Sequence, residues 1–173
     1  MITLEQLKAV YKEAPDVRLE IYLPALQDMM EKYQINTPVR IQMFLAQIGH
    51  ESAELLYSEE IASGKAYEGR VDLGNTEEGD GVRYKGRGLL QITGKNNYGK
   101  CGEALGLPLL EIPELLSHIP YSVDSAGWYW NTNNLNSFCD ANDFERLTKK
   151  INGGLNGYTN RLMLYQRAKK VIQ

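Results

Sequence analysis

Three glutamates near the middle of the chain have the side-chain type and spacing that acid–base chemistry requires. Glu51 ends an apolar helical stripe, and Glu59 and Glu60 follow in a glycine-rich segment. Burial raises the pKa of a carboxyl group, so a carboxyl that continues a buried stripe suits a general acid, while a partly solvated partner suits a base. Paired carboxylates of this kind hydrolyse glycosides, although any acidic surface also brings glutamates together.

Side chains that suit a bound sugar follow these glutamates. Neutral amides and hydroxyls match sugar hydroxyl groups, and aromatic rings match the apolar face of a sugar. The residues of these types are Tyr84, Gln91, Thr93, Asn96, Asn97, Tyr98, Trp128 and Trp130. For the two tryptophans, packing in the core is the simpler explanation.

Other kinds of site lack the residues that they need. A zinc-binding helix would need a second histidine four residues after His50, where the chain has Glu54, and the only other histidine is His118. The segment 86–88 lacks the further glycine and lysine of a phosphate-binding loop, and neither cysteine nor any serine lies in a nucleophile motif. We therefore expect no metal and no cofactor.

Composition excludes further classes of protein. The chain has 173 residues and a net charge of −3, which argues against a broad basic surface for nucleic acid. No apolar run approaches the ~20 residues of a membrane span, and the first residues do not resemble a secretory signal. We expect a protein made in the cytoplasm, with no nucleic-acid partner and no stable membrane insertion. Two cysteines are too few for a disulfide scaffold, so free buried thiols are expected.

Helical patterns dominate the elements that must position these residues. Thr3 and Gln6 form a capping box, Thr37-Pro38 starts the helix that ends in Glu51, and Asp140 is expected to cap the helix that follows it. Between residues 58 and 88 glycines replace the apolar periodicity, which predicts a long loop or a short hairpin. The expected helices span residues 4–11, 19–33, 38–51, 97–105, 120–130, 144–151 and 158–172, with a short turn at 113–116.

Four ordered segments of the chain carry a family resemblance. They are residues 44–52, which end in His50-Glu51-Ser52, then residues 66–81, residues 84–98 with Tyr84-Lys85-Gly86-Arg87-Gly88, and residues 151–165 with Asn152-Gly153-Gly154. Together they resemble glycoside hydrolase family 19, which comprises plant-type chitinases and phage lysozymes, and above all its small phage and prophage branch. One departure is that the family often has Gly-Gly where this chain has Ala53-Glu54.

The resemblance implies a fold, a mechanism and a set of site residues. The fold is a mainly α, lysozyme-like (α+β) one with two helical lobes around a substrate cleft, forming a single catalytic domain over residues 1–173 with no separate wall-binding domain. Glu51 would be the acid, Glu60 the base and Thr93 the residue that orients water, in an inverting mechanism that needs ~6.5–9.5 Å between the carboxyl groups. The substrate-binding residues would be His50, Tyr84, Arg87, Gln91, Asn97, Tyr98, Asn152 and Arg161, and Arg161 would be an arginine of the cleft that can pair with a carboxylate.

The resemblance also suggests a substrate and a place of action. A compact catalytic domain without a disulfide framework resembles an endolysin, a monomer that cleaves β-1,4 bonds in peptidoglycan glycan strands and reaches the wall through a holin's membrane lesion. A chitinase that acts on N-acetylglucosamine polymers is the alternative enzyme. A wall-binding module that has lost catalysis is the alternative of another class, which the presence of both glutamates and Thr93 disfavours.

Overall fold

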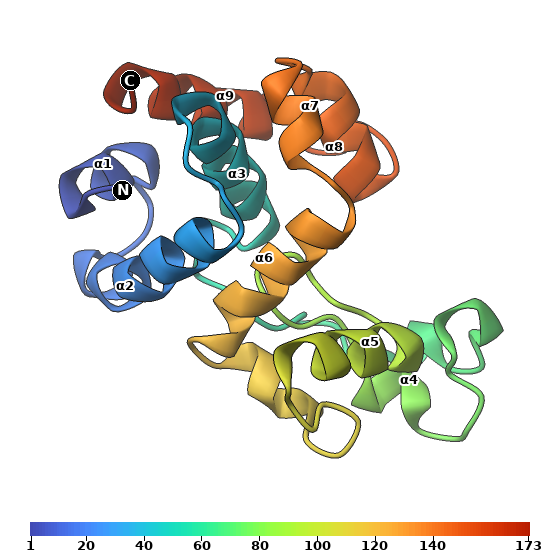
Figure 1. Cartoon of the computed structure of the whole chain (residues 1–173). Coiled ribbons are helices and arrows are strands. Elements are labelled where there is room, and N and C mark those ends of the chain that lie inside the picture. Colours follow the sequence, from blue (N-terminus) through green and yellow to red (C-terminus); the bar gives the residue numbers. More distant parts are fainter. The chain divides into compact units, whose positions relative to one another are not determined.

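A computed structural model describes all 173 residues, and they fold into helices and loops without a strand (Figure 1). The chain forms two compact units: unit 1 comprises Met1–Leu56 and Tyr129–Gln173, and unit 2 comprises Tyr57–Trp128. The mainly helical fold is confirmed. Its elements are α1 (Leu4–Val10), α2 (Asp16–Lys32), α3 (Pro38–Glu51), the 3₁₀ helices η1 (Lys65–Tyr67) and η2 (Val71–Leu73), α4 (Asp80–Arg83), α5 (Lys95–Leu105), η3 (Pro113–Ser117), α6 (Tyr121–Thr132), α7 (Asn136–Asp140), α8 (Phe144–Asn152) and α9 (Tyr158–Val171).

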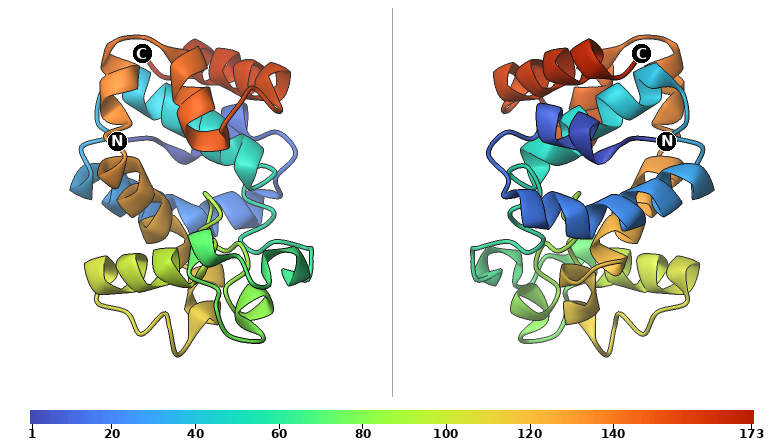
Figure 2. Two further views of the ribbon diagram at one scale, coloured as in Figure 1. Left: turned by 90° about the vertical axis from the view of Figure 1, so that its right-hand side faces the viewer. Right: turned by 90° about the vertical axis from the view of Figure 1, so that its left-hand side faces the viewer.

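Helix α3 is the centre of unit 1. Every residue from Gln42 to Gly49 is buried, because α3 packs against both α9 and α7, and α3 and α9 lie side by side in each view (Figures 1 and 2). The ring of Phe44 meets that of Trp130 edge to face, with 5.0 Å between centroids. Trp130 is fully buried, so core packing is its role. A helix enclosed in this way fixes its last residue, Glu51, to the core.

Local signals set several helix ends in unit 1. Thr3 and Gln6 form the predicted capping box, and the Thr37 hydroxyl accepts from the Arg40 N–H ahead of Pro38. The expected cap at Asp140 is wrong, because Asp143 caps α8. Asp140 instead ends the short helix α7, which the sequence did not indicate.

The inward face of α9 differs from the apolar pattern of its sequence. The apolar Leu162 is 37% exposed, whereas Arg161 is completely buried beside Leu164, Tyr165 and Ala168. These four positions follow helical spacing and form the inward face of α9, which therefore includes a charged residue. A buried arginine is tolerated only where partners satisfy its charge and its N–H groups.

Unit 2 builds the predicted glycine-rich loop without a hairpin. Residues 58–88 contain η1, η2 and α4, and the only pairings of strand type are two isolated antiparallel bridges, Glu59 with Arg87 and Arg87 with Ile92. The buried Asn75 ties the loop down, since its side chain donates to the Tyr67 carbonyl and accepts from the Lys95 N–H. None of the helices in the chain is both long and apolar enough to cross a membrane.

Candidate active site

Glu51 lies at the C-terminal end of α3, next to a buried guanidinium. Nη2 of Arg161 donates to Glu51 Oε1 at 2.5 Å, and the two side chains are 0% and 21% exposed respectively. The expectation that Glu51 lies within apolar surroundings is therefore wrong. Its carboxylate is half-buried and faces a cation, because the residue that α9 turns inward at this level is Arg161.

A buried polar network holds Arg161 in place. Its Nη1 donates to Gln47 Oε1 at 2.6 Å, its Nε donates to the Asn156 carbonyl, and Gln47 Nε2 in turn donates to Thr148 Oγ1. Gln47 and Thr148 are completely buried. Sequence reasoning missed Gln47, although it precedes Glu51 by one helical turn and so shares its face of α3. The network leaves Arg161 little freedom to follow another partner.

A left-handed turn follows Glu51 at the position where the family often has Gly-Gly. Ala53, Glu54 and Leu55 have φ values of 49°, 57° and 69°, a region that side chains disfavour. The Glu54 carboxylate is buried, accepts from the Glu13 N–H at 2.7 Å and pairs with Arg167 at 3.2 Å. These contacts clamp the turn. Ala53 and Glu54 therefore adopt the backbone geometry that glycines would favour, and the Glu54 side chain anchors the turn.

His50 packs against the loop between α8 and α9. Its Nδ1 lies 2.9 Å from Asn160 Oδ1, and a Cβ on Gly157 would come within 2.0 Å of the imidazole ring, so this loop position accepts only glycine. Asn152 Oδ1 accepts from the Asn156 N–H within the same loop. His50, Asn152 and Arg161 are thus brought together around the end of α3 that carries Glu51, and their substrate-binding roles stay predictions.

Glu60, in unit 2, is held by uncharged donors. Its Oε2 accepts from the Gly86 N–H at 3.0 Å and its Oε1 from the Tyr67 hydroxyl at 3.1 Å, while its own N–H donates to the Gly86 carbonyl. Burial and the bond to Glu60 raise the pKa of Tyr67, which keeps the phenol protonated as a donor. Tyr67 was not among the predicted site residues.

Glu59 has quite different surroundings from its neighbour. Its carboxylate lies 2.7 Å from Lys85 Nζ and 3.6 Å from Arg87 Nη2, and it accepts from the Ser117 hydroxyl. Burial by itself raises the pKa of Glu59, but the hydrogen bonds from Lys85 and Ser117 outweigh that effect and hold its pKa below the usual range. Glu59 therefore neutralises two cations, which leaves Glu60 as the carboxylate without an ionic partner.

Gln91 and Thr93 converge with Glu60 on the backbone of Gly86. A Cβ placed on Gly86 would lie 2.5 Å from Gln91 Oε1, 3.1 Å from Glu60 Oε2 and 3.3 Å from Thr93 Oγ1. The Thr93 hydroxyl donates to the Gln91 carbonyl, and Asn97 Nδ2 donates to the Thr93 carbonyl. The structure thus gathers four predicted site residues of unit 2 in one place.

Three further predicted binding residues lie inside unit 2 instead. Tyr84, Arg87 and Tyr98 are 4%, 4% and 0% exposed. The Tyr98 hydroxyl donates to the Lys85 carbonyl and accepts from Arg87 Nη1, and the Tyr84 hydroxyl donates to the Leu110 carbonyl. Direct contact with a substrate does not fit this burial. Their hydrogen bonds hold the loop that carries Gly86 in place. The family motif thus contains residues that stabilise this loop as well as residues that could bind substrate.

The side chains that could bind a metal or act as a thiol nucleophile are not arranged for either role. The structure contains no group of three or more histidine, cysteine, aspartate or glutamate side chains placed to hold a metal ion. Cys101 and Cys139 are free and buried, and burial raises the pKa of each thiol to about 12, so neither is a nucleophile.

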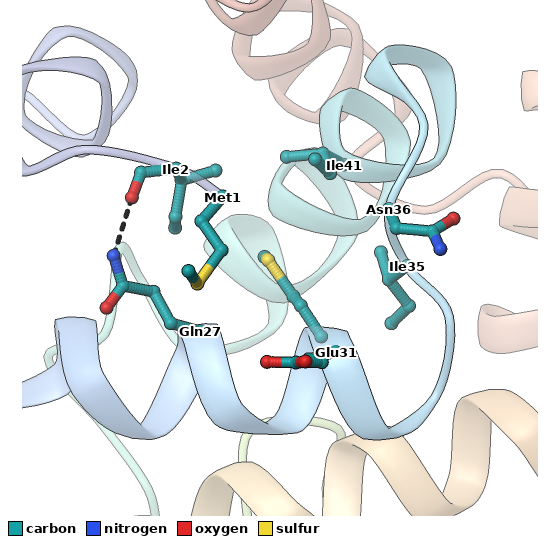
Figure 3. Close-up of a pocket in the computed structure, with 8 residues that line it drawn as sticks. Met1, Ile2, Gln27, Glu31, Ile35, Asn36 and Ile41 are labelled. Atoms are coloured by element: carbon teal, nitrogen blue, oxygen red, sulfur yellow. Dashed lines mark hydrogen bonds between the residues drawn. The ribbon is translucent and has the colours of Figure 1, made fainter.

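An apolar pocket lies elsewhere in unit 1. It has a volume of about 290 Å³ beside the first residues of the chain, and Gln27 closes one side by donating to the Ile2 carbonyl (Figure 3). None of the predicted site residues lines it. Its lining is Met1, Ile2, Gln27, Met30, Glu31, Ile35, Asn36 and Ile41.

Comparison with known proteins identifies the family. The sequence profile of glycoside hydrolase family 19, described as class I chitinase, matches residues 39–144. A glycosyl hydrolase family 19 domain-containing protein of Haemophilus influenzae is 33% identical over an alignment of 173 positions, which covers 82% of this chain and 84% of that protein. The chain belongs to glycoside hydrolase family 19. An Arabidopsis thaliana endochitinase is 42% identical over 115 positions, but the match covers only 39% of that protein.

Solved structures agree with the fold of this family 19 chain. Chitinase C of Streptomyces griseus has a TM-score of 0.77 at 22% identity, covering 99% of this chain and 76% of that one. A class IV chitinase of Zea mays also gives 0.77, at 19% identity and with 92% of its chain covered. The protein is therefore a glycoside hydrolase with the family's lysozyme-like fold, an enzyme that hydrolyses glycosidic bonds of a glycan. The profile match includes Glu51, Glu60 and Thr93.

Proposed function

We propose that this family 19 hydrolase cleaves the β-1,4 bonds of peptidoglycan by an inverting mechanism, with Glu51 as acid and Glu60 as base. The family resemblance assigns which carboxyl is the acid and which is the base, and the contrast between their surroundings supports two separate roles. Glu51 pairs with a buried guanidinium, whereas both oxygens of Glu60 accept hydrogen bonds from uncharged donors. Two carboxylates in different environments are what separate acid and base roles require.

The surroundings of Glu51 support proton donation to the leaving oxygen. When Glu51 gives its proton to the glycosidic oxygen, the charge left on its carboxylate lies beside Arg161 Nη2. Gln47 and the Asn156 carbonyl already hold Arg161 there, so the charge is stabilised without reorganisation of the site. Arg161 thus assists catalysis by stabilising the ionised carboxylate of Glu51.

The surroundings of Glu60 support its role as the base. An ionised carboxylate has about four acceptor positions, and Gly86 and Tyr67 occupy two of those on Glu60. The others accept a proton from water. The Thr93 hydroxyl lies near Glu60 Oε2 at Gly86 and would orient that water toward the face of the sugar opposite the leaving group. Attack from that face inverts the anomeric centre.

Peptidoglycan is the proposed substrate for two reasons. One protein that is similar over most of both chains, that of Haemophilus influenzae, is bacterial, and the cysteines of this chain are free, as expected for an endolysin without a disulfide framework. Hydrolysis of chitin is the second candidate, since identity to an Arabidopsis thaliana endochitinase reaches 42%. We further propose that the enzyme acts on the wall after release through a holin. Cells expressing the chain should then lyse only when a holin is expressed with it.

Digestion of purified peptidoglycan and of chitin tests the proposal. We expect new N-acetylmuramic acid reducing ends from peptidoglycan, and proton NMR at early times should show the α-anomer that inversion of a β bond produces. The Glu51→Gln variant is the matched control and should release none. Release of peptides alone would refute glycosidase action on this substrate, the β-anomer would refute inversion, and faster turnover of chitin would favour the chitinase.

A further inference from the structure

A polar groove opens in unit 1 at the end of α3 opposite Glu51. It has a volume of about 480 Å³, which is within the ~300–1,000 Å³ of ligand pockets. The ends of α2 and α6, the first turn of α3 and helix α7 meet there. Four side-chain amides line this amide groove, together with an aromatic ring and an ion pair. They are Gln34, Asn131, Asn134 and Asn136, with Tyr33 and the pair Arg40–Asp140.

Arg40, Asp140 and Asn136 in the amide groove have hydrogen-bond partners within the protein. Arg40 donates from Nε and Nη2 to both carboxylate oxygens of Asp140, at 2.7 and 2.6 Å. Asn136 accepts from Trp130 Nε1 and donates to the Tyr33 carbonyl. Because the guanidinium is already neutralised by a bidentate partner, the groove does not have the free cationic cluster that a polyanion would need.

The rim of the groove, by contrast, has amides without partners. The side chains of Gln34, Asn131 and Asn134 are exposed and make no hydrogen bond within the protein. Gln34 and Asn134 also have positive φ values, 56° and 52°, where α2 and α6 end. Tyr33 also lines the groove and is half-buried, with Lys32 Nζ 5.2 Å from its ring centroid. The rim thus presents donors and acceptors beside an aromatic ring.

The amide groove is separate from the end of α3 that carries the catalytic acid. Arg40 lies in the first turn of α3 and Glu51 is its last residue. Eleven residues of α-helix separate them by ~16 Å along the axis, at ~1.5 Å per residue. A ligand in the groove therefore leaves Glu51 free.

We propose that the amide groove is a second, non-catalytic site that binds an N-acetylated amino-sugar strand. Unpaired amides match the hydroxyl and acetamido groups of such a strand, which are neutral and both donate and accept, and the Tyr33 ring offers an apolar surface. The proposal rests on the proposed function, in that the bound strand is the substrate polymer. Occupying both sites raises the effective concentration of glycosidic bonds near Glu51.

NMR titration with N-acetylglucosamine tetramer reports directly on the groove. We expect the side-chain amide signals of Asn131 and Asn134 to shift, while those of Asn36 and Gln166, which are exposed amides of unit 1 outside the groove, stay unchanged. Titrating muropeptides in a second arm distinguishes a chitin-type from a wall-type strand, and a shift in either arm supports the site. Unchanged signals of Asn131 and Asn134 in both arms would overturn it.

A sedimentation assay with the Glu51→Gln variant tests binding without catalysis. Adding Asn131→Ala and Asn134→Gly, with glycine chosen because Asn134 has a positive φ, should weaken binding to insoluble polymer about tenfold, the scale of losing two hydrogen bonds between neutral groups. Adding Asn36→Ala and Gln166→Ala instead should leave binding unchanged, and equal melting temperatures would exclude a folding defect. Equal binding by both sets would overturn the proposal. Because no bond is cleaved, failure here differs from failure to hydrolyse glycans.

Discussion

Replacing Glu54 by glutamine tests what holds the left-handed turn after the catalytic acid. The turn keeps three residues with side chains at positive φ, from Ala53 to Leu55, and each such residue costs ~1–2 kcal/mol. The buried Glu54 carboxylate opposes that cost through the Glu13 N–H and the Arg167 guanidinium. Glutamine keeps the size of the side chain but removes the charge.

The expected loss follows from those two contacts. Hydrogen bonds to charged groups contribute ~1.5–3 kcal/mol each, and glutamine retains a neutral acceptor for one of them. We therefore expect Glu54→Gln to lower the free energy of unfolding by ~2 kcal/mol, about 4–8 °C in melting temperature for a chain of this size. Because the turn follows Glu51 directly, kcat should fall as well.

A matched variant separates the clamp from the backbone strain. Ala53→Gly relieves one left-handed residue and restores one glycine of the family pattern, so its melting temperature should stay equal to or rise above that of the parent. Circular dichroism melts and kcat on a soluble glycan oligomer measure both variants. An unchanged melting temperature for Glu54→Gln would refute the clamp, and a destabilised Ala53→Gly would refute the strain.

The remaining predictions concern the carboxylates themselves. Glu51→Gln should abolish hydrolysis while circular dichroism shows an intact fold, since the amide oxygen still accepts from Arg161; near-normal turnover would refute the acid role. Glu60→Gln should lose at least ~100-fold in kcat, whereas Thr93→Ala should lose less and Glu59→Gln should lose least. Added azide should restore activity to Glu60→Ala. If Glu59→Gln lost more activity than Glu60→Gln, the base would be Glu59. Glu59 has a lowered pKa in the folded protein, so its ion pairs stabilise the fold above the ordinary glutamate pKa and lose this effect as pH falls through the lowered one. Glu59→Gln should therefore lower the melting temperature at pH 7 but leave it unchanged at pH 2, and equal losses at both pH values would contradict this.

The longer helices and their order could be predicted from the sequence because local signals suffice for them, whereas the short helices α4 and α7 were not predicted. The capping box at Thr3 and Gln6, the Thr37-Pro38 start and the stop at Gly153 act within a few residues of the chain. The helix cap at Asp140 was predicted wrongly for a related reason. Two aspartates three residues apart both suit a cap, but Asp143 directly precedes α8 and caps it, whereas Asp140 pairs with Arg40.

The residues of the candidate site could be named from the sequence, but their surroundings could not. The motif around Glu51 and the segment from Tyr84 to Tyr98 indicate family 19 chemistry because a short motif supplies both the reacting group and its local backbone. Whether a motif residue faces solvent or the interior depends on packing between distant segments. Tyr84, Arg87 and Tyr98 are buried for that reason, although their types suit a sugar.

The resemblance implied that Arg161 can pair with a carboxylate, but which carboxylate has which partner was decided by the tertiary structure. Glu51 and Arg161 lie on different helices, α3 and α9, and no local pattern shows which face α9 turns inward. A carboxylate with an apolar neighbour and one with a guanidinium neighbour behave differently, because electrostatic interactions depend on distance in space. The sequence by itself thus determined which groups the protein has for hydrolysing a glycosidic bond. The packing of helices distant in the chain determined the electrostatic environment in which Glu51 acts.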